Sequence, residues 1–241
     1  MTIKDDAVYQ CQVGASGTAS PIRSGPAQLK VMVPPGVPRI MQGEVMETVD
    51  GVETVLECSS SGGRPAGEVF ENVLVMIYFI VCFQIVWKDE EGKEILTNTM
   101  TRTKKLADMK TFETISVLRL KPGIEDDRKK IFCSVSSDIS PAPTSTMTVL
   151  RLKYKPRIKL DYKSEALNEG DSFTATCKVD AYPEQVEYSW YVNGKLMELE
   201  KKDKLTILKV TKKHGNGRVE CQARNSVGMA TAEATIKLKC E

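Results

Sequence analysis

Residues 177–190, CKVDAYPEQVEYSW, contain the pattern that decides the fold of this chain. The stretch begins with Cys177 and ends with Trp190, and Cys221 follows in the segment VECQAR. The same series occurs earlier as Cys58, Trp87 and Cys133. The chain therefore contains an internal repeat, with one of its two tryptophans in each copy.

A cysteine, a tryptophan and a second cysteine in this order are typical of an immunoglobulin-type β-sandwich. In that fold the tryptophan packs on a disulfide between the two sheets, which here would join Cys58 to Cys133 and Cys177 to Cys221. Alternating apolar and polar residues in the runs 116–120, 205–210 and 232–238 predict antiparallel strands. Asn193-Gly194 predicts a tight hairpin turn. We therefore predict an all-β protein of tandem immunoglobulin-like Greek-key sandwiches, with Trp87 and Trp190 in their cores.

A third, partial series begins the chain. Its residues are Asp5, Ala7, Tyr9 and Cys11, in the pattern D-x-A-x-Y-x-C of a tyrosine corner. We expect residues 1–33 to be the C-terminal remnant of a first immunoglobulin domain, whose earlier strands would precede this sequence. A second domain at 36–152 and a third at 155–239 would follow, with junctions at 33–37 and 153–155.

The second domain contains an anomalous insertion at residues 69–84. Cys58 and Trp87 are 29 residues apart, against 13 for Cys177 and Trp190, and removing these 16 residues restores the spacing. The apolar run 73–83 is too short to span a membrane, and as a loop it would be an aggregation hazard. We interpret the segment as an intron read in frame, because valine codons can begin with GT and Phe-Gln can be encoded by TTTCAG. A translated splice-variant loop is the alternative, in which Cys82 is a spare thiol.

Composition and motifs argue against several functional classes. With 34 Lys and Arg against 32 Asp and Glu, the net charge of +2 does not indicate a nucleic-acid binder. The sequence has no phosphate-binding loop, nucleophile motif or metal-ligand spacing, and its single histidine, His214, lies in a polar turn. We therefore predict no enzyme activity, catalytic residue, metal ligand or cofactor, and no nucleic-acid or small-molecule partner. Neither Cys11 nor Cys240 is expected to pair within the chain.

Four stretches resemble the extracellular immunoglobulin domains of the nephrin-like family, which includes roughest, kin-of-irre, the Neph proteins and the synaptogenesis receptor. These stretches are residues 5–13, 31–35, 62–66 and 225–228. The resemblance implies an adhesion and recognition receptor, the extracellular part of a type I protein of the plasma membrane. Its partners would be immunoglobulin-superfamily proteins of the same or a sister class across cell contacts, in synapse-partner choice, cell fusion or junction formation. We expect the signal peptide, membrane span and cytoplasmic tail of such a receptor to lie outside this sequence.

The resemblance places the binding surface on the sheet of domain one that contains its F and G strands. Strand alternation directs Tyr9 and Cys11 into the core and Gln10 and Gln12 outward, where amides can both donate and accept hydrogen bonds. Gln10 and Gln12 are therefore candidate partner-binding residues, although two exposed glutamines can also simply keep a surface strand soluble. Since most of domain one is missing, we expect the fragment not to adhere by itself.

The alternative function is an intracellular immunoglobulin array of the muscle-filament type. A complete cysteine pair in each full domain instead favours an oxidising compartment. Thiol labelling distinguishes the two, since protected cysteines support the receptor and full labelling of a folded protein supports the array.

Overall fold

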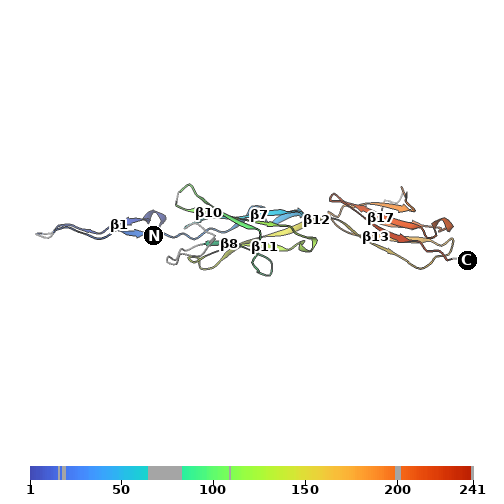
Figure 1. Ribbon diagram of the computed structural model, residues 1–241, viewed down its shortest axis with the longest axis horizontal. Helices are drawn as coiled ribbons and strands as arrows, with labels where there is room; N and C mark the ends of the chain where they lie inside the picture. Colours follow the sequence, from blue (N-terminus) through green and yellow to red (C-terminus); the bar gives the residue numbers. More distant parts are fainter. Residues whose placement is uncertain (16, 18–19, 65–82, 109, 199–201, 240–241) are drawn as a thin grey trace. The chain divides into compact units, whose positions relative to one another are not determined.

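The computed structural model describes residues 1–15, 17, 20–64, 83–108, 110–198 and 202–239 (Figure 1). Residues 69–82 of the predicted insertion, with Cys82, lie outside the described residues, and so does Cys240. The chain forms two units. The N-terminal unit comprises Met1–Met46, Glu53–Lys121 and Arg128–Leu150, and the C-terminal unit comprises Glu47–Val52, Pro122–Asp127 and Arg151–Glu241. The domain ranges 1–33, 36–152 and 155–239 remain a proposal.

Short strands and one 3-10 turn begin the N-terminal unit. The turn η1 spans Ile3–Asp5, and the strands are β1 (Ala7–Tyr9), β2 (Gln12–Val13), β3 (Ile22–Arg23) and β4 (Ala27–Leu29). β1 pairs antiparallel with β4, and β2 pairs antiparallel with β3. Together they form one hairpin, which we call the N-terminal hairpin.

Two larger sheets follow. The first has the order β5-β7-β10-β9, with β5 at Arg39–Ile40, β7 at Thr54–Gly63, β10 at Phe112–Leu120 and β9 at Thr99–Lys105. The second contains β8 (Phe83–Lys88), β11 (Lys130–Ser137) and the first part of β12 (Thr144–Tyr162), while β6 (Val45–Val49) also pairs with β12. The turn η2 spans Ile124–Asp126. In Figure 1, β7 and β10 run together, as do β8 and β11.

The core of the N-terminal unit centres on a disulfide between Cys58 of β7 and Cys133 of β11. Trp87 is 1% exposed and packs in this core. Its indole Nε1 donates to Ser116 Oγ at 3.0 Å, which provides the acceptor that a buried N–H requires. Ser116 is itself buried, so a polar residue of β10 is retained at an inward position for this bond.

The C-terminal unit has the same architecture. The second part of β12 pairs with β13 (Phe173–Tyr182), which pairs with β16 (Lys204–Ile207). The other sheet has the order β15-β14-β17-β18, with β15 at Lys195–Leu196, β14 at Glu187–Val192, β17 at Arg218–Arg224 and β18 at Met229–Thr235. The turn η3 spans Lys212–His214. Cys177 and Cys221 form a disulfide, and the fully buried Trp190 donates from Nε1 to the Lys202 carbonyl at 2.8 Å. The predicted all-β fold is confirmed.

Several local predictions can be compared with the structure. The Asn193-Gly194 turn is confirmed, because both residues have positive φ, at 50° and 75°, and connect β14 to β15. The run 205–210 was predicted as one strand, but β16 ends at Ile207. The prediction of a strand over 232–238 is likewise wrong at its end, because β18 ends at Thr235. In 205–210 the alternation breaks at the adjacent apolar residues Ile207 and Leu208, where β16 ends. In 232–238 the apolar alternation continues past the last ladder pair, so there periodicity alone does not mark the end of the strand.

The predicted junction 153–155 and the end of the predicted insertion lie within strands. Residues 153–155, predicted as a junction, lie inside β12, whose register shifts between Tyr154 and Arg157. Phe83 and Gln84, the last two residues of the predicted insertion, begin β8. Phe83 is 3% exposed, and a Cβ on Gly63 would lie only 2.5 Å from its ring, so the glycine leaves the space that the ring fills.

Candidate functional site

The N-terminal hairpin contains Gln10 and Gln12, the residues predicted to contact a partner. In the β1–β4 pair Tyr9 lies opposite Ala27, and in the β2–β3 pair Gln12 lies opposite Arg23. Two residues, 10 and 11, therefore face three residues, 24–26. This mismatch is a β-bulge, which bends a strand and changes the direction of nearby side chains.

Ser24 stabilises the bulge. Its backbone N–H donates to the Cys11 carbonyl at 2.9 Å, and its Oγ accepts from the Cys11 N–H at 3.0 Å. Gln10 Nε2 donates to the Ser24 carbonyl at 2.8 Å, so one amide hydrogen of Gln10 is used within the hairpin. Gln12 lies in β2 and is exposed. The structure thus separates the two glutamines: Gln10 supports the bulge and Gln12 faces solvent.

Tyr9 forms the hydrogen bond that the tyrosine-corner pattern implies. Its hydroxyl donates to the Asp5 carbonyl at 2.9 Å and holds η1 against the start of the hairpin. The prediction that Tyr9 and Cys11 point into a core is wrong for the described residues, because Tyr9 is 50% exposed and Cys11 is an exposed free thiol. Apart from the partly buried Leu29, every residue of β1, β2, β3 and β4 is exposed.

Arg64 connects the hairpin segment to the rest of its unit. The Arg64 side chain forms an ion pair with Asp6, and the two side chains are only 23% and 10% exposed. The Arg64 backbone forms a two-way bridge with Val33, by N–H···O bonds of 2.9 and 3.1 Å. One residue at the end of β7 therefore holds both the beginning and the end of the N-terminal segment.

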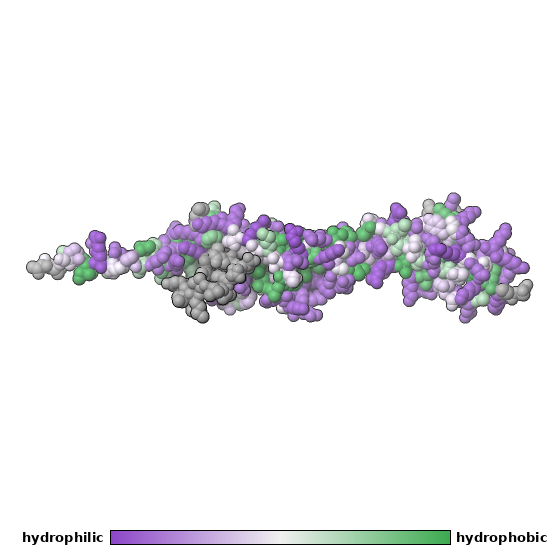
Figure 2. All heavy atoms as spheres, viewed as in Figure 1, coloured by the Kyte–Doolittle hydropathy of each residue, from purple (hydrophilic) through white to green (hydrophobic). Residues whose placement is uncertain are grey.

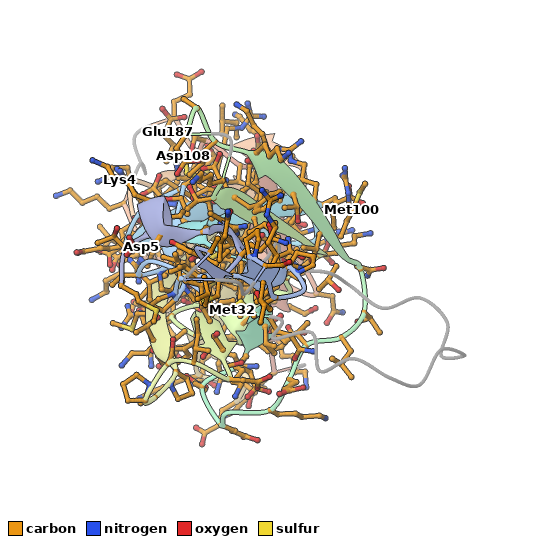
Figure 3. All side chains as sticks on the ribbon, turned by 90° about the vertical axis from the view of Figure 1, so that its left-hand side faces the viewer. Lys4, Asp5, Met32, Met100, Asp108 and Glu187 are labelled. Carbon is orange, nitrogen blue, oxygen red and sulfur yellow. A yellow bond between two sulfur atoms is a disulfide. The ribbon has the colours of Figure 1, made fainter. Side chains whose placement is uncertain are left out.

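A second attachment involves the turn after β9. Lys110 Nζ donates to the Ile3 carbonyl at 2.9 Å. The turn is shaped by Asp108, whose carboxylate accepts from Thr111 Oγ1 at 2.6 Å and from the backbone N–H of Lys110 at 2.9 Å. The hydrogen bond from the Thr111 hydroxyl is the main cause that lowers the pKa of Asp108. Lys4 and Asp5 accordingly lie on the same side of the molecule as Asp108 (Figure 3).

Neither Arg64 nor Lys110 has a role predicted from the sequence. Arg64 lies in the stretch 62–66 that carried the family resemblance, which was the only signal available. Lys110 sits in a polar loop that resembles many solvated loops. Both contacts depend on residues far away in the sequence, so no local pattern predicts them.

A family model described as an immunoglobulin domain matches residues 155–225. The irregular chiasm C-roughest protein of Drosophila melanogaster is 28% identical, over 98% of this chain and 32% of that protein. Kin of IRRE-like protein 2 of Mus musculus is also 28% identical, over 98% of this chain and 31% of that protein. The chain thus spans about a third of the length of these relatives.

Solved structures show the same fold. A crystal structure of Rst D1-D2 has 30% identity and a TM-score of 0.55, covering 64% of this chain and 66% of that one. The ectodomain of mouse nectin-like molecule 4 has a TM-score of 0.63 at 21% identity, covering 99% of this chain and 75% of that one. Titin domains I67–I69 have a TM-score of 0.58 at 21% identity, covering 100% and 77%. At 21% identity the last two matches establish the fold alone. Among the described residues, no helix is long and apolar enough to cross a membrane.

Proposed function

We propose that this chain, which belongs to the immunoglobulin-superfamily family of roughest and the kin-of-IRRE proteins, is part of the extracellular portion of a cell-adhesion receptor. The observation that carries the proposal is the similarity to roughest over 98% of the chain. The two disulfides support it, because such bonds persist in oxidising compartments. Its activity is binding rather than catalysis, and its partners are immunoglobulin-superfamily proteins on an opposing cell. Synapse-partner choice, cell fusion and junction formation are the settings in which it would act.

The N-terminal hairpin is the proposed recognition element. Gln12 is exposed on β2, and its amide offers donors and an acceptor to a partner. Gln10 keeps one N–H on Ser24 and has its second N–H and its Oε1 for a partner. The Arg64 ion pair and the Lys110 hydrogen bond would hold this element in a defined orientation within its unit.

A chimera tests the proposal. The matching region of roughest is replaced by this chain, and the chimera is expressed on cells that are scored for aggregation with cells carrying a partner. We expect aggregation to be retained, and Gln12→Ala to weaken it more than the matched change Gln84→Ala at an exposed position of β8 in the following sandwich. Surface expression is measured for every variant. A chimera that reaches the surface but does not aggregate contradicts the proposal.

The alternative is an intracellular array of the muscle-filament type, since the immunoglobulin fold that the chain shares with titin is compatible with either function. Labelling of the native chain with a thiol reagent separates the two. We expect Cys58, Cys133, Cys177 and Cys221 to be protected until a reductant is added, whereas Cys11 reacts. Full labelling of the folded, unreduced chain would support the array.

A further inference from the structure

The outer face of the sheet β12-β13-β16 in the C-terminal unit is polar and basic. The inward residues of these strands pack on the core, including Leu160, Cys177 and Leu205. Alternation therefore directs the intervening residues outward. The outward residues are Arg157, Lys159, Asp161, Thr174, Thr176, Lys178, Asp180, Lys204 and Thr206. We call this surface the lysine face.

The strand register aligns three lysines across this face. Lys159 lies directly opposite Lys178, and Lys204 lies opposite Thr176, two residues along β13 from Lys178. Opposite residues have Cβ atoms about 5 Å apart, and diagonal neighbours are about 7–8 Å apart. The three ammonium groups thus form a diagonal row over three strands. Like charges directly opposite one another destabilise a sheet, so this arrangement is costly for the fold alone.

Carboxylates compensate only part of this charge. Asp161 forms an ion pair with Lys178 at 2.7 Å, and this hydrogen bond is the main cause that lowers the Asp161 pKa. Asp180 lies opposite Arg157 and accepts from the Tyr154 hydroxyl at 2.7 Å. Neither Lys159 nor Lys204 forms an ion pair with a carboxylate of the described residues.

The charge is also unevenly divided along the sequence. Residues 151–241 contain 18 Lys and Arg against 13 Asp and Glu, while residues 1–150 contain 16 against 19. The excess of positive charge therefore belongs to the part of the chain that includes the lysine face. Figure 2 shows hydrophilic residues over much of the visible surface of the C-terminal unit.

A hollow of about 420 Å³ lies at one end of the same face. Its polar lining residues are Asp161, Lys163, Ser172, Thr174 and Thr176, and Tyr162, Leu167 and Phe173 complete the lining. Its volume falls within the range of small-ligand sites. Hydroxyls beside an aromatic ring and a carboxylate can hydrogen-bond the hydroxyls of one sugar ring.

We propose that the lysine face binds a sulfated glycosaminoglycan, with sulfates along Lys159, Lys178 and Lys204 and a sugar ring in the adjoining hollow. The row of cations suits an extended polyanion, and threonine hydroxyls between the lysines can bond to its sugars. The outward residues include no aromatic platform for stacked bases, which disfavours single-stranded nucleic acid. They also include no large apolar anchor, which disfavours an acidic protein partner. The inference rests on the extracellular placement in the proposed function.

Binding of the whole chain to immobilised heparin tests the proposal. We expect binding at about 0.15 M salt that weakens steeply as salt rises, because cations on a polyanion release counterions. The variant Lys159→Thr/Lys178→Thr/Lys204→Thr should bind about a hundredfold more weakly, since each lysine near an anionic surface contributes roughly fivefold. Threonine suits exposed strand positions, so the sheet is retained.

Two further variants make the test specific. Lys195→Thr/Lys212→Thr/Lys213→Thr removes the same charge from exposed residues outside the lysine face and should weaken binding less than threefold. Replacing the three face lysines by arginine keeps the charge and should retain binding, which separates loss of charge from misfolding.

Three results would overturn the proposal. They are equal weakening in the control triple variant, equally tight binding of fully desulfated heparin, and equally tight binding of single-stranded DNA. A chimera that fails to aggregate would leave heparin binding unaffected, so the two proposals fail separately.

Discussion

Replacement of Arg64 by methionine should release the N-terminal hairpin segment from the rest of its unit. Methionine keeps much of the apolar stem but leaves the Asp6 carboxylate, 10% exposed, without its cation. Removing one partner of a fully buried ion pair costs about 3–5 kcal/mol, whereas an exposed pair contributes at most about 1 kcal/mol. The intermediate burial of this pair places the expected cost of Arg64→Met at about 2 kcal/mol.

Amide hydrogen exchange at Val33 measures this cost where the N-terminal segment is attached to Arg64. The N–H of Val33 donates to the Arg64 carbonyl, and that bond breaks when the segment detaches. If the cost is about 2 kcal/mol, Val33 should exchange about thirtyfold faster in Arg64→Met. The matched control is Arg102→Met, whose ion pair with Glu57 is 3.8 Å long and exposed, and which should change Val33 exchange less than about threefold.

A double-mutant cycle with Asp6→Asn isolates the pairwise contribution. The double variant should be destabilised by less than the sum of the two single variants, because each single change leaves one charge unpaired. Unchanged exchange at Val33, or equal acceleration in the Arg102 control, would refute the view that this ion pair holds the hairpin. Additive effects of the two single changes would refute it as well.

Three further predictions concern stability. Ser116→Ala leaves the buried Trp87 N–H without its acceptor, and denaturant unfolding should show a loss of about 1–3 kcal/mol. Replacing both Cys177 and Cys221 by alanine opens a loop with a sequence separation of 44, and the free energy of unfolding should fall by about 4 kcal/mol on the chain-entropy model. Burial, with a hydrogen bond to a carboxylate, raises the pKa of Tyr154 to about 12 from 10.0. The folded chain then keeps a proton that the unfolded chain loses, so stability should fall as pH rises from 10 to 12, and Tyr154→Phe should reduce that slope.

Much of the fold could be predicted from local patterns. The Asn193-Gly194 turn depends on two adjacent residues that tolerate positive φ, and strands such as β10 follow from period-two alternation. The end of β18 could not be predicted, because the alternating pattern continues to Leu238 after the ladder has ended at Thr235.

The candidate site was predicted less completely. The prediction of Gln10 and Gln12 rests on the family resemblance, which places the binding surface on this sheet, and on alternation, which assumes an even strand. The bulge at residues 24–26 breaks that assumption, and the Gln10 amide donates to the Ser24 carbonyl. Predicting the bulge requires the register of two strands, and neither strand contains that information separately.

By itself, the sequence determined the all-β class and the repeated order of cysteine, tryptophan and cysteine. Both follow from local information, because apolar alternation is a property of a single strand and the order of the three residues can be read along the chain. Only the tertiary structure decided that Arg64 pairs with Asp6 and bridges Val33, and that Lys159, Lys178 and Lys204 share one face. These arrangements depend on which strands pair and in which register. Pairing and register are determined by the burial of whole sheet faces, which joins residues that no local pattern connects.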